Sequence, residues 1–150
     1  MKLFEFSLRR MLSYKEQVQG LEKNKLAQLI IIKHKLEDLI GTLKLQSSKL
    51  SNRLLKVAQS GASAIEICNY NFQLQNNRMY LKHLSDELYI ASLAVEEQLK
   101  VVIIATQEVE GLEKLKEKQY QEYLYEDKKA QDLIVSEFIS SKLAREKNSR

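Results

Sequence analysis

Apolar residues recur at heptad spacing over residues 81–112, and this repeat limits the possible folds more than any other feature of the sequence. The residues at its two alternating core positions are Leu81, Leu84, Leu88, Ala91, Val95, Val102, Ala105, Val109 and Leu112. Such a repeat places one apolar stripe along an α-helix and predicts a seam against a partner helix. One polar residue, Gln98, interrupts the stripe, and a single polar core residue typically fixes the register or the choice of partner.

The stripe changes character after Leu112. The next core positions hold Lys116, Gln119, Tyr123, Glu126 and Ala130. Such residues are typical of an exposed or loosely packed helix. We therefore expect one part of this helix to pair with another helix of the same chain, and the other part to remain available to a different partner.

Composition favours long uninterrupted helices. The 150 residues include four glycines and no proline, whereas average usage would supply about seven prolines. Proline is the residue that a helix interior tolerates least. With no tryptophan, 44% hydrophobic residues and 29% charged residues, the chain resembles an elongated helical protein more than a compact enzyme with a deep pocket.

The first part of the chain predicts one helix, at about residues 3–59. Its apolar residues recur mostly at spacings of three and four, which is the helical pattern. Two successive steps of four, from Leu21 through Lys25 to Leu29, predict a stutter that relaxes the supercoil locally.

A turn is predicted at about residues 60–63, because serine, asparagine and glycine gather in residues 47–63. Ser63 with Glu66 matches the capping box of a helix start. Helix two is therefore predicted at about residues 64–146. The expected fold is all-α, a single coiled-coil domain over residues 1–150 that forms a long antiparallel two-helix hairpin with the second helix longer.

The two arms of this hairpin are unequal in length. With the turn near Gly61, Met1 lies beside about residue 121, so residues 121–150 extend past the partner helix. This segment carries apolar residues without an intramolecular neighbour, which predicts a binding surface. Fraying of the segment, or its folding back, remains open.

Candidate catalytic or metal-binding residues are few. His83 shares a helix face with Asp86 and Glu87, but a metal site needs three or four converging ligands, so a solvated polar face is favoured. Cys68 has no histidine within a turn, which favours a small packing residue over a nucleophile. The sequence contains no glycine-rich phosphate loop and no G-x-S-x-G elbow. We expect no enzyme activity, no cofactor and no metal.

Charge and hydropathy indicate the compartment and exclude some partners. The formal net charge is +4, but basic residues alternate with acidic ones, whereas nucleic-acid binding needs a basic stripe. The longest apolar runs are too short to cross a bilayer, and the start of the chain lacks the apolar run of a secretory signal. A single cysteine suits a reducing compartment. We expect a soluble, cytoplasmic protein.

Several short motifs follow one another in a particular order along the chain. They are Phe4–Leu8 with Leu12 and Lys15–Glu16, then Ser60–Ser63, Tyr70, Leu112–Tyr120 and Glu126–Lys129. This ordered set, which spans nearly the whole chain, resembles the bacterial flagellar export protein FliJ family. The resemblance implies a non-enzymatic antiparallel coiled coil that serves as a stalk of the flagellar type III export apparatus.

The resemblance also implies partners and a location. The partners are the hexameric flagellar export ATPase, the cytoplasmic region of the export gate protein, and export chaperones, with no nucleic acid. The location is the cytoplasmic face of the inner membrane at the flagellar base, with membrane association only through the export apparatus. The role implied is protein transport in flagellum biogenesis and motility.

Two contact regions follow from the resemblance. The residues implied at the ATPase ring are Phe4, Phe6, Leu112, Leu115, Gln119, Tyr120 and Tyr123. The residues implied at the export gate are Leu43, Leu50, Tyr70, Phe72, Tyr80 and Leu84. For Leu43, Leu50 and Leu84, a role in the coiled-coil core is equally open. Gln73 and Asn77 stand where apolar residues would be expected.

Two other interpretations of the sequence are open. One is a generic cytoplasmic coiled-coil adaptor, or a homodimeric scaffold in which the seam of residues 81–112 pairs between chains. The other is a nucleic-acid-binding helical protein, whose affinity would fall steeply with salt.

Overall fold

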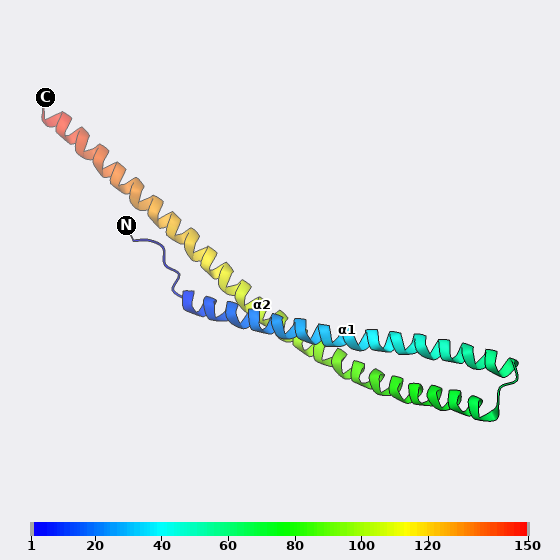
Figure 1. The fold of residues 1–150 in the computed structure, drawn as a ribbon. Helices are drawn as coiled ribbons and strands as arrows, with labels where there is room; N and C mark the ends of the chain where they lie inside the picture. Colours follow the sequence, from blue (N-terminus) through cyan, green and yellow to red (C-terminus); the bar gives the residue numbers. More distant parts are fainter. Residues whose placement is uncertain (1, 150) are drawn as a thin grey trace. The chain divides into compact units, whose positions relative to one another are not determined.

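A computed structural model describes residues 2–149 and contains two α-helices joined by a short turn (Figure 1). Helix α1 is Arg9–Gln59 and helix α2 is Ala64–Asn148. The described residues contain no strand, and no helix among them is long and apolar enough to span a membrane. The structure confirms the predicted fold class, an all-α antiparallel hairpin with the second helix longer.

Helix α1 begins at Arg9, whereas the sequence analysis placed its start near residue 3. The described residues before it, 2–8, are not helical, and we call them the N-terminal segment. Phe4, Phe6 and Leu8 are wholly or partly buried, whereas Glu5 and Ser7 are exposed. Over residues 2–6 this alternation is the pattern of an extended chain that covers a surface with every second side chain, and Ser7 and Leu8 form the turn that leads into α1. The prediction was wrong because it counted only the spacing of four from Phe4 to Leu8.

The turn between the helices covers residues 60–63, as predicted. Gly61 has a φ of 85°, a left-handed conformation in which glycine avoids the steric cost of a Cβ. The N–H of Ala62 donates to the carbonyl of Val57 at 3.1 Å, which satisfies a carbonyl at the end of α1. At the start of α2, the Ser63 hydroxyl accepts a hydrogen bond from the N–H of Glu66 at 3.3 Å. The sequence motif therefore caps α2 through its serine.

Contacts divide the chain into two compact units. The terminal unit is Met1–Gln19 with Ile104–Arg150, and the turn unit is Gly20–Ile103. Each helix contributes to both units, so the single domain predicted over residues 1–150 comprises two contact units.

In the turn unit, both helices bury an unbroken heptad stripe. On α1 the wholly or partly buried stripe is Glu22, Leu26, Leu29, Lys33, Leu36, Ile40, Leu43, Ser47, Leu50, Leu54 and Val57. On α2 it is Ile67, Tyr70, Leu74, Asn77, Leu81, Leu84, Leu88, Ala91, Val95, Gln98 and Val102. Leu21 and Lys25 are exposed, so the predicted stutter is wrong. The pattern misled because a charged residue, Glu22, takes the core position beside Leu21.

In the terminal unit, a small core forms where the N-terminal segment and the start of α1 meet α2. Phe6, Leu12 and Val109 are buried together, with Phe4, Leu8, Leu112 and Leu115 packed against them. Beyond Leu112 the partly buried residues of α2 are Leu115, Gln119, Tyr123, Asp127 and Ala130. Lys116 and Glu126, two of the core positions expected there, are exposed. The spacing shifts because α2 here faces the extended N-terminal segment, which does not wind around it as a helix would.

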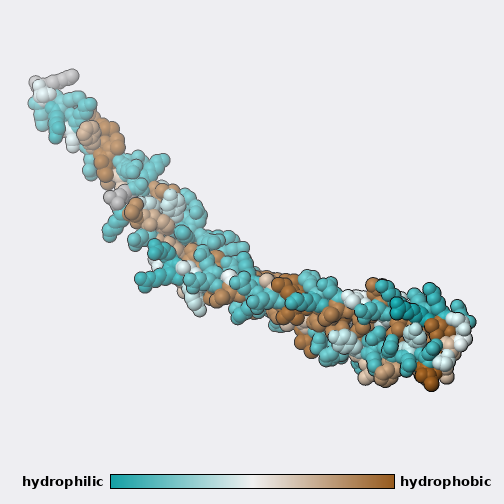
Figure 2. Space-filling view, in the orientation of Figure 1, coloured by the Kyte–Doolittle hydropathy of each residue, from teal (hydrophilic) through white to brown (hydrophobic). Residues whose placement is uncertain are grey.

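The last part of α2 has no neighbour in its unit. Every described residue from Gln131 onward is exposed (Figure 1, orange to red). Figure 2 shows brown apolar side chains among teal polar ones along this end of the helix. An end of α2 that extends past its partner was predicted, but it begins at about residue 131 and not at residue 121, because Tyr123 packs against Phe4 and donates a hydrogen bond to Lys2.

Candidate partner-binding surfaces

An aromatic cluster in the terminal unit joins the N-terminal segment to α2. It consists of Phe4, Tyr120 and Tyr123. The Phe4 ring centroid lies 5.2 Å from that of Tyr120 in an edge-on arrangement and 5.6 Å from that of Tyr123. The two tyrosine rings are stacked with centroids 6.4 Å apart. The Tyr123 hydroxyl donates a hydrogen bond to the carbonyl of Lys2 at 2.8 Å.

Local sequence explains why this cluster forms. Tyr120 and Tyr123 are three residues apart on α2, so they share one face of the helix. Phe4 reaches them because the N-terminal segment turns alternate side chains toward α2. Aromatic pairs in such geometry add about 0.5–1.5 kcal/mol beyond the burial of their surface. The cluster therefore holds the N-terminal segment on α2 while Tyr120, with 39% of its surface exposed, remains accessible.

The residues implied at the ATPase ring all lie in this terminal unit, but they differ in accessibility. Phe6 is buried, and Leu112 and Leu115 pack against the same core. Phe6 therefore supports the surface from within, whereas Leu112 and Leu115 are partly buried. Gln119 and Tyr123 are partly buried. Of the residues implied at the ring, Tyr120 is the exposed one, so the aromatic cluster is the candidate surface.

An open groove runs beside the aromatic cluster. It is lined by Phe4, Glu5, Phe6, Ser7, Arg9, Arg10 and Lys116. Three of these residues are cationic and one is anionic, and the first turn of α1 contains no acidic residue. This groove is the basic side of the cluster, whereas a second groove, beside Phe4 and Tyr120, is lined by Glu113, Lys116 and Glu117.

The residues implied at the export gate all lie in the turn unit. Leu43 and Leu84 are buried, which makes them core residues, the interpretation that the sequence left open. Leu50 and Tyr70 are partly buried in the same stripe. Only Phe72, 67% exposed, and Tyr80, 50% exposed, are accessible to a partner. They lie about two turns apart on α2.

Sequence reasoning missed further exposed apolar residues on α2. Met79, Tyr89 and Ile90 each leave about two thirds of their surface exposed. None belongs to the buried stripe of the helix. A search for large apolar residues outside the heptad core positions would have found them.

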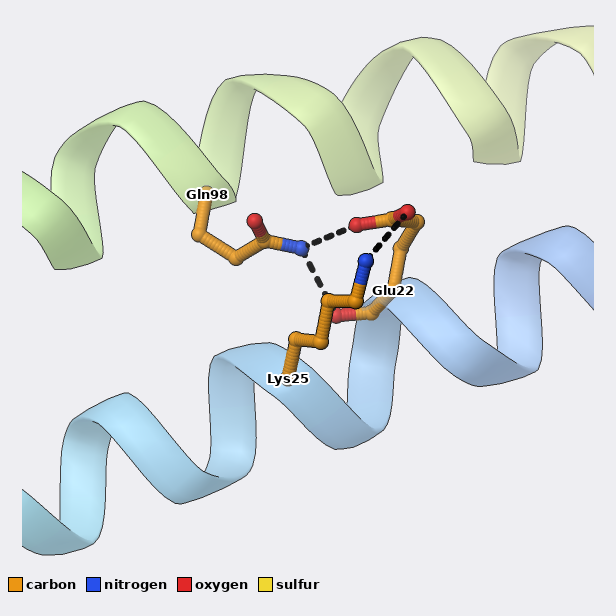
Figure 3. Close-up of polar contacts among 3 residues, drawn as sticks. All are labelled: Glu22, Lys25 and Gln98. Atoms are coloured by element: carbon orange, nitrogen blue, oxygen red, sulfur yellow. Dashed lines mark hydrogen bonds and ion pairs between the residues drawn. The ribbon is translucent and has the colours of Figure 1, made fainter.

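Polar residues pair across the seam where apolar ones are missing. In the turn unit, the Gln98 amide donates hydrogen bonds to the Glu22 carboxylate and, at 3.0 Å, to the Glu22 backbone carbonyl (Figure 3). The Gln98 hydrogen bond, helped by the Lys25 ammonium 3.4 Å away, holds the pKa of Glu22 below its ordinary value. Asn77 likewise donates to the Ser47 hydroxyl at 3.1 Å. These pairs support the register role expected of Gln98.

The candidate reactive residues remain separate. His83 pairs with Glu87 at 3.0 Å on an exposed face, and the described residues contain no group of three potential metal ligands. Cys68 is exposed, so its predicted packing role is wrong. The neighbouring Ile67 takes the core position and leaves the Cys68 side chain outside the seam.

Comparisons with protein-family models, with curated proteins and with solved structures find no match to this chain. Its functional interpretation therefore rests on two accessible surfaces, one in each unit. The first is the aromatic cluster with its basic groove in the terminal unit. The second consists of Phe72 and Tyr80 in the turn unit.

Proposed function

We propose that the chain is a non-enzymatic stalk component of a flagellar type III export apparatus. In this role it binds the hexameric export ATPase, the cytoplasmic region of the export gate protein, and export chaperones. It acts at the cytoplasmic face of the inner membrane and associates with the membrane only through the apparatus. The main support is the aromatic cluster, because its members come from the two motifs that carry the resemblance, Phe4–Leu8 and Leu112–Tyr120, and from Tyr123 just beyond them.

The proposed ring contact is the aromatic cluster with its groove. Tyr120 is exposed, and the groove beside Phe4 carries the cationic side chains of Arg9, Arg10 and Lys116. Aromatic residues and arginine are the side chains that most often dominate protein–protein binding energies. The buried Phe6 supports this surface by fixing the N-terminal segment beneath it.

The proposed gate contact is on α2 in the turn unit. Phe72 and Tyr80 are accessible there, whereas Leu43 and Leu84 fill the core between the helices. Exposed aromatic side chains of this kind bury large areas at low entropic cost when a partner covers them. The hairpin thus offers its two proposed partners separate surfaces on separate units.

Binding measurements with the purified export ATPase and gate cytoplasmic region from the same cell test this proposal. Tyr120→Ala is expected to weaken ATPase binding about tenfold, and Phe72→Ala to weaken gate binding by a similar factor. Each variant should leave the other partner's affinity unchanged. Tyr89→Ala, which removes another exposed aromatic residue of α2, is the control. Failure of the unsubstituted chain to bind either partner would remove the proposal.

A coiled-coil adaptor is the second candidate, and the exposed Met79, Tyr89 and Ile90 favour it. The resemblance assigns these residues no role. If Tyr89→Ala weakened a complex that Tyr120→Ala and Phe72→Ala left unchanged, the adaptor would be the better explanation. A scaffold joined through residues 81–112 is disfavoured, because Leu84, Val102, Ala105 and Val109 are already buried within one chain.

A further inference from the structure

The free end of α2 carries a face that complements itself. We call residues 128–148 the tail; all its side chains except Ala130 are exposed. Lys128, Asp132, Val135, Ile139, Lys142 and Glu146 follow one another at steps of four, three, four, three and four. These steps place the six residues on one side of the helix, as at the core positions of a coiled coil.

The six residues run charged, charged, apolar, apolar, charged, charged, and each charged residue has the opposite sign to the one at the mirrored position. When a second tail is laid antiparallel on the first, Val135 faces Ile139, Asp132 faces Lys142, and Lys128 faces Glu146. Each of these pairs occurs twice about the two-fold axis. The two central layers are thus apolar, and the four outer layers join opposite charges. This is the isologous arrangement of a symmetric dimer.

A parallel arrangement would give the opposite result. It would place each residue against its own copy, and four of the six layers would then bring together like charges. The antiparallel arrangement also brings two sets of like charges level with each other: Glu137 with its copy, and Lys129 with Arg145. None of these three residues belongs to the stripe of six, so these like charges lie away from the paired face. The charge pattern therefore selects one partner and one orientation.

We propose that the tail is a docking surface for the tail of a second copy of this chain, paired antiparallel with its centre near residue 137. Val135, 56% exposed, and Ile139, 52% exposed, form the apolar centre. Phe138 and Leu143, which are also exposed, flank it. The inference goes beyond the export role, because it uses residues that neither proposed contact includes.

The expected association is weak and concentration dependent. Two short helical segments with two apolar layers bury less than the area of a standard interface, about 1,200–2,000 Å². The charged layers contribute mainly to orientation and partner choice, because desolvation offsets much of their attraction. We therefore expect a monomer–dimer equilibrium in the micromolar to millimolar range.

Sedimentation equilibrium of the full chain, at concentrations up to about 1 mM, tests the proposal. Asp132→Lys and Lys142→Asp should each weaken association at least tenfold, because each puts like charges in two layers. The double variant Asp132→Lys/Lys142→Asp should restore it, because the pairs reform with their signs exchanged. Lys129→Asp, an equal change of charge off the face, is the matched control and should have little effect. Circular dichroism should show equal helix content in all four variants, since the substituted side chains are exposed.

Three outcomes would overturn the proposal. They are a monomer at every concentration, a double variant as weak as the single ones, or a control as weak as Asp132→Lys. The measurement uses only the purified chain, so its failure leaves the proposed export role untouched. Failure of ATPase and gate binding would likewise leave the tail pairing standing.

Discussion

Single polar side chains in the seam determine how the helices of the turn unit align. Gln98 donates to two oxygen atoms of Glu22, and Asn77 donates to Ser47. A slip of the register by one heptad would leave these groups facing apolar neighbours without partners, which costs free energy. The purely apolar layers would tolerate such a slip better. The polar pairs therefore specify one alignment among several that hydrophobic burial alone would permit.

The pairing of Gln98 with Glu22 makes stability depend on pH. The pKa of Glu22 is lower in the folded chain than its ordinary value of 4.5, so its contribution is present at neutral pH and is lost as pH falls through the folded pKa. Gln98→Ala should lower the melting temperature at pH 7, and the difference from the unsubstituted chain should shrink toward pH 3. Thermal unfolding followed by circular dichroism at both pH values measures this. Gln75→Ala, at an exposed position, should give no such pH dependence.

Two adjacent valines provide a sharper test of the seam. Val102 is buried, whereas Val101 is 43% exposed. Val102→Asp should destabilise the hairpin by about 3 kcal/mol or more, because it puts a carboxylate into an apolar layer. Val101→Asp should cost less than about 1 kcal/mol. Urea unfolding of both variants measures the difference in stability. Equal unfolding midpoints would mean that Val102 does not face the partner helix as described.

The N-terminal segment is the element that the sequence was least able to reveal. Its alternation of Phe4, Phe6 and Leu8 also contains a helical spacing of four, and a segment of so few residues carries too little pattern to separate the two. The structure resolves the ambiguity through long-range packing, since Phe6 is buried against Val109. Contacts between residues so far apart in the sequence cannot be predicted from the spacing of apolar residues within a short segment. The heptads of residues 81–112, in contrast, repeat often enough to predict a helix and its buried face.

Removing the Phe6 ring should detach the N-terminal segment. Phe6→Ala deletes one of three buried residues in the core of the terminal unit, at a cost of about 3 kcal/mol. Hydrogen exchange should become faster at the start of α1, where the N–H of Arg9 donates to the carbonyl of Phe6. Protection in the turn unit should stay unchanged, because its stripe is independent of Phe6. Leu3→Ala, at an almost fully exposed position, serves as the control.

For the molecule as a whole, sequence predicted topology better than it predicted surfaces. Turn residues, the cap at Ser63 and the missing proline were enough for the hairpin and its unequal arms. The sequence could not predict which of the implied contact residues are accessible to a partner. Phe6 and Leu84 are buried whereas Tyr120 and Phe72 are exposed, and this difference depends on which helix face meets the partner helix. Both pairs consist of large apolar or aromatic residues, so residue type alone does not separate them.

Shortening the chain separates the parts that hold the fold from those that do not. A chain ending after Ala130 should keep the melting temperature of the full chain within a few degrees, because every described residue removed is exposed. A chain ending after Gln119 should melt lower, because it loses Tyr120 and Tyr123 from the aromatic cluster. Differential scanning calorimetry compares the two. Equal melting temperatures for both shortened chains would contradict the structural role given to the cluster.

The exposed Cys68 has a practical use. It is the single thiol of the chain and lies in the second turn of α2, close to the hairpin turn. A maleimide dye would therefore label one known position without any substitution. Fluorescence polarisation of that dye would then report which binding molecules approach this end of the turn unit and which dock elsewhere.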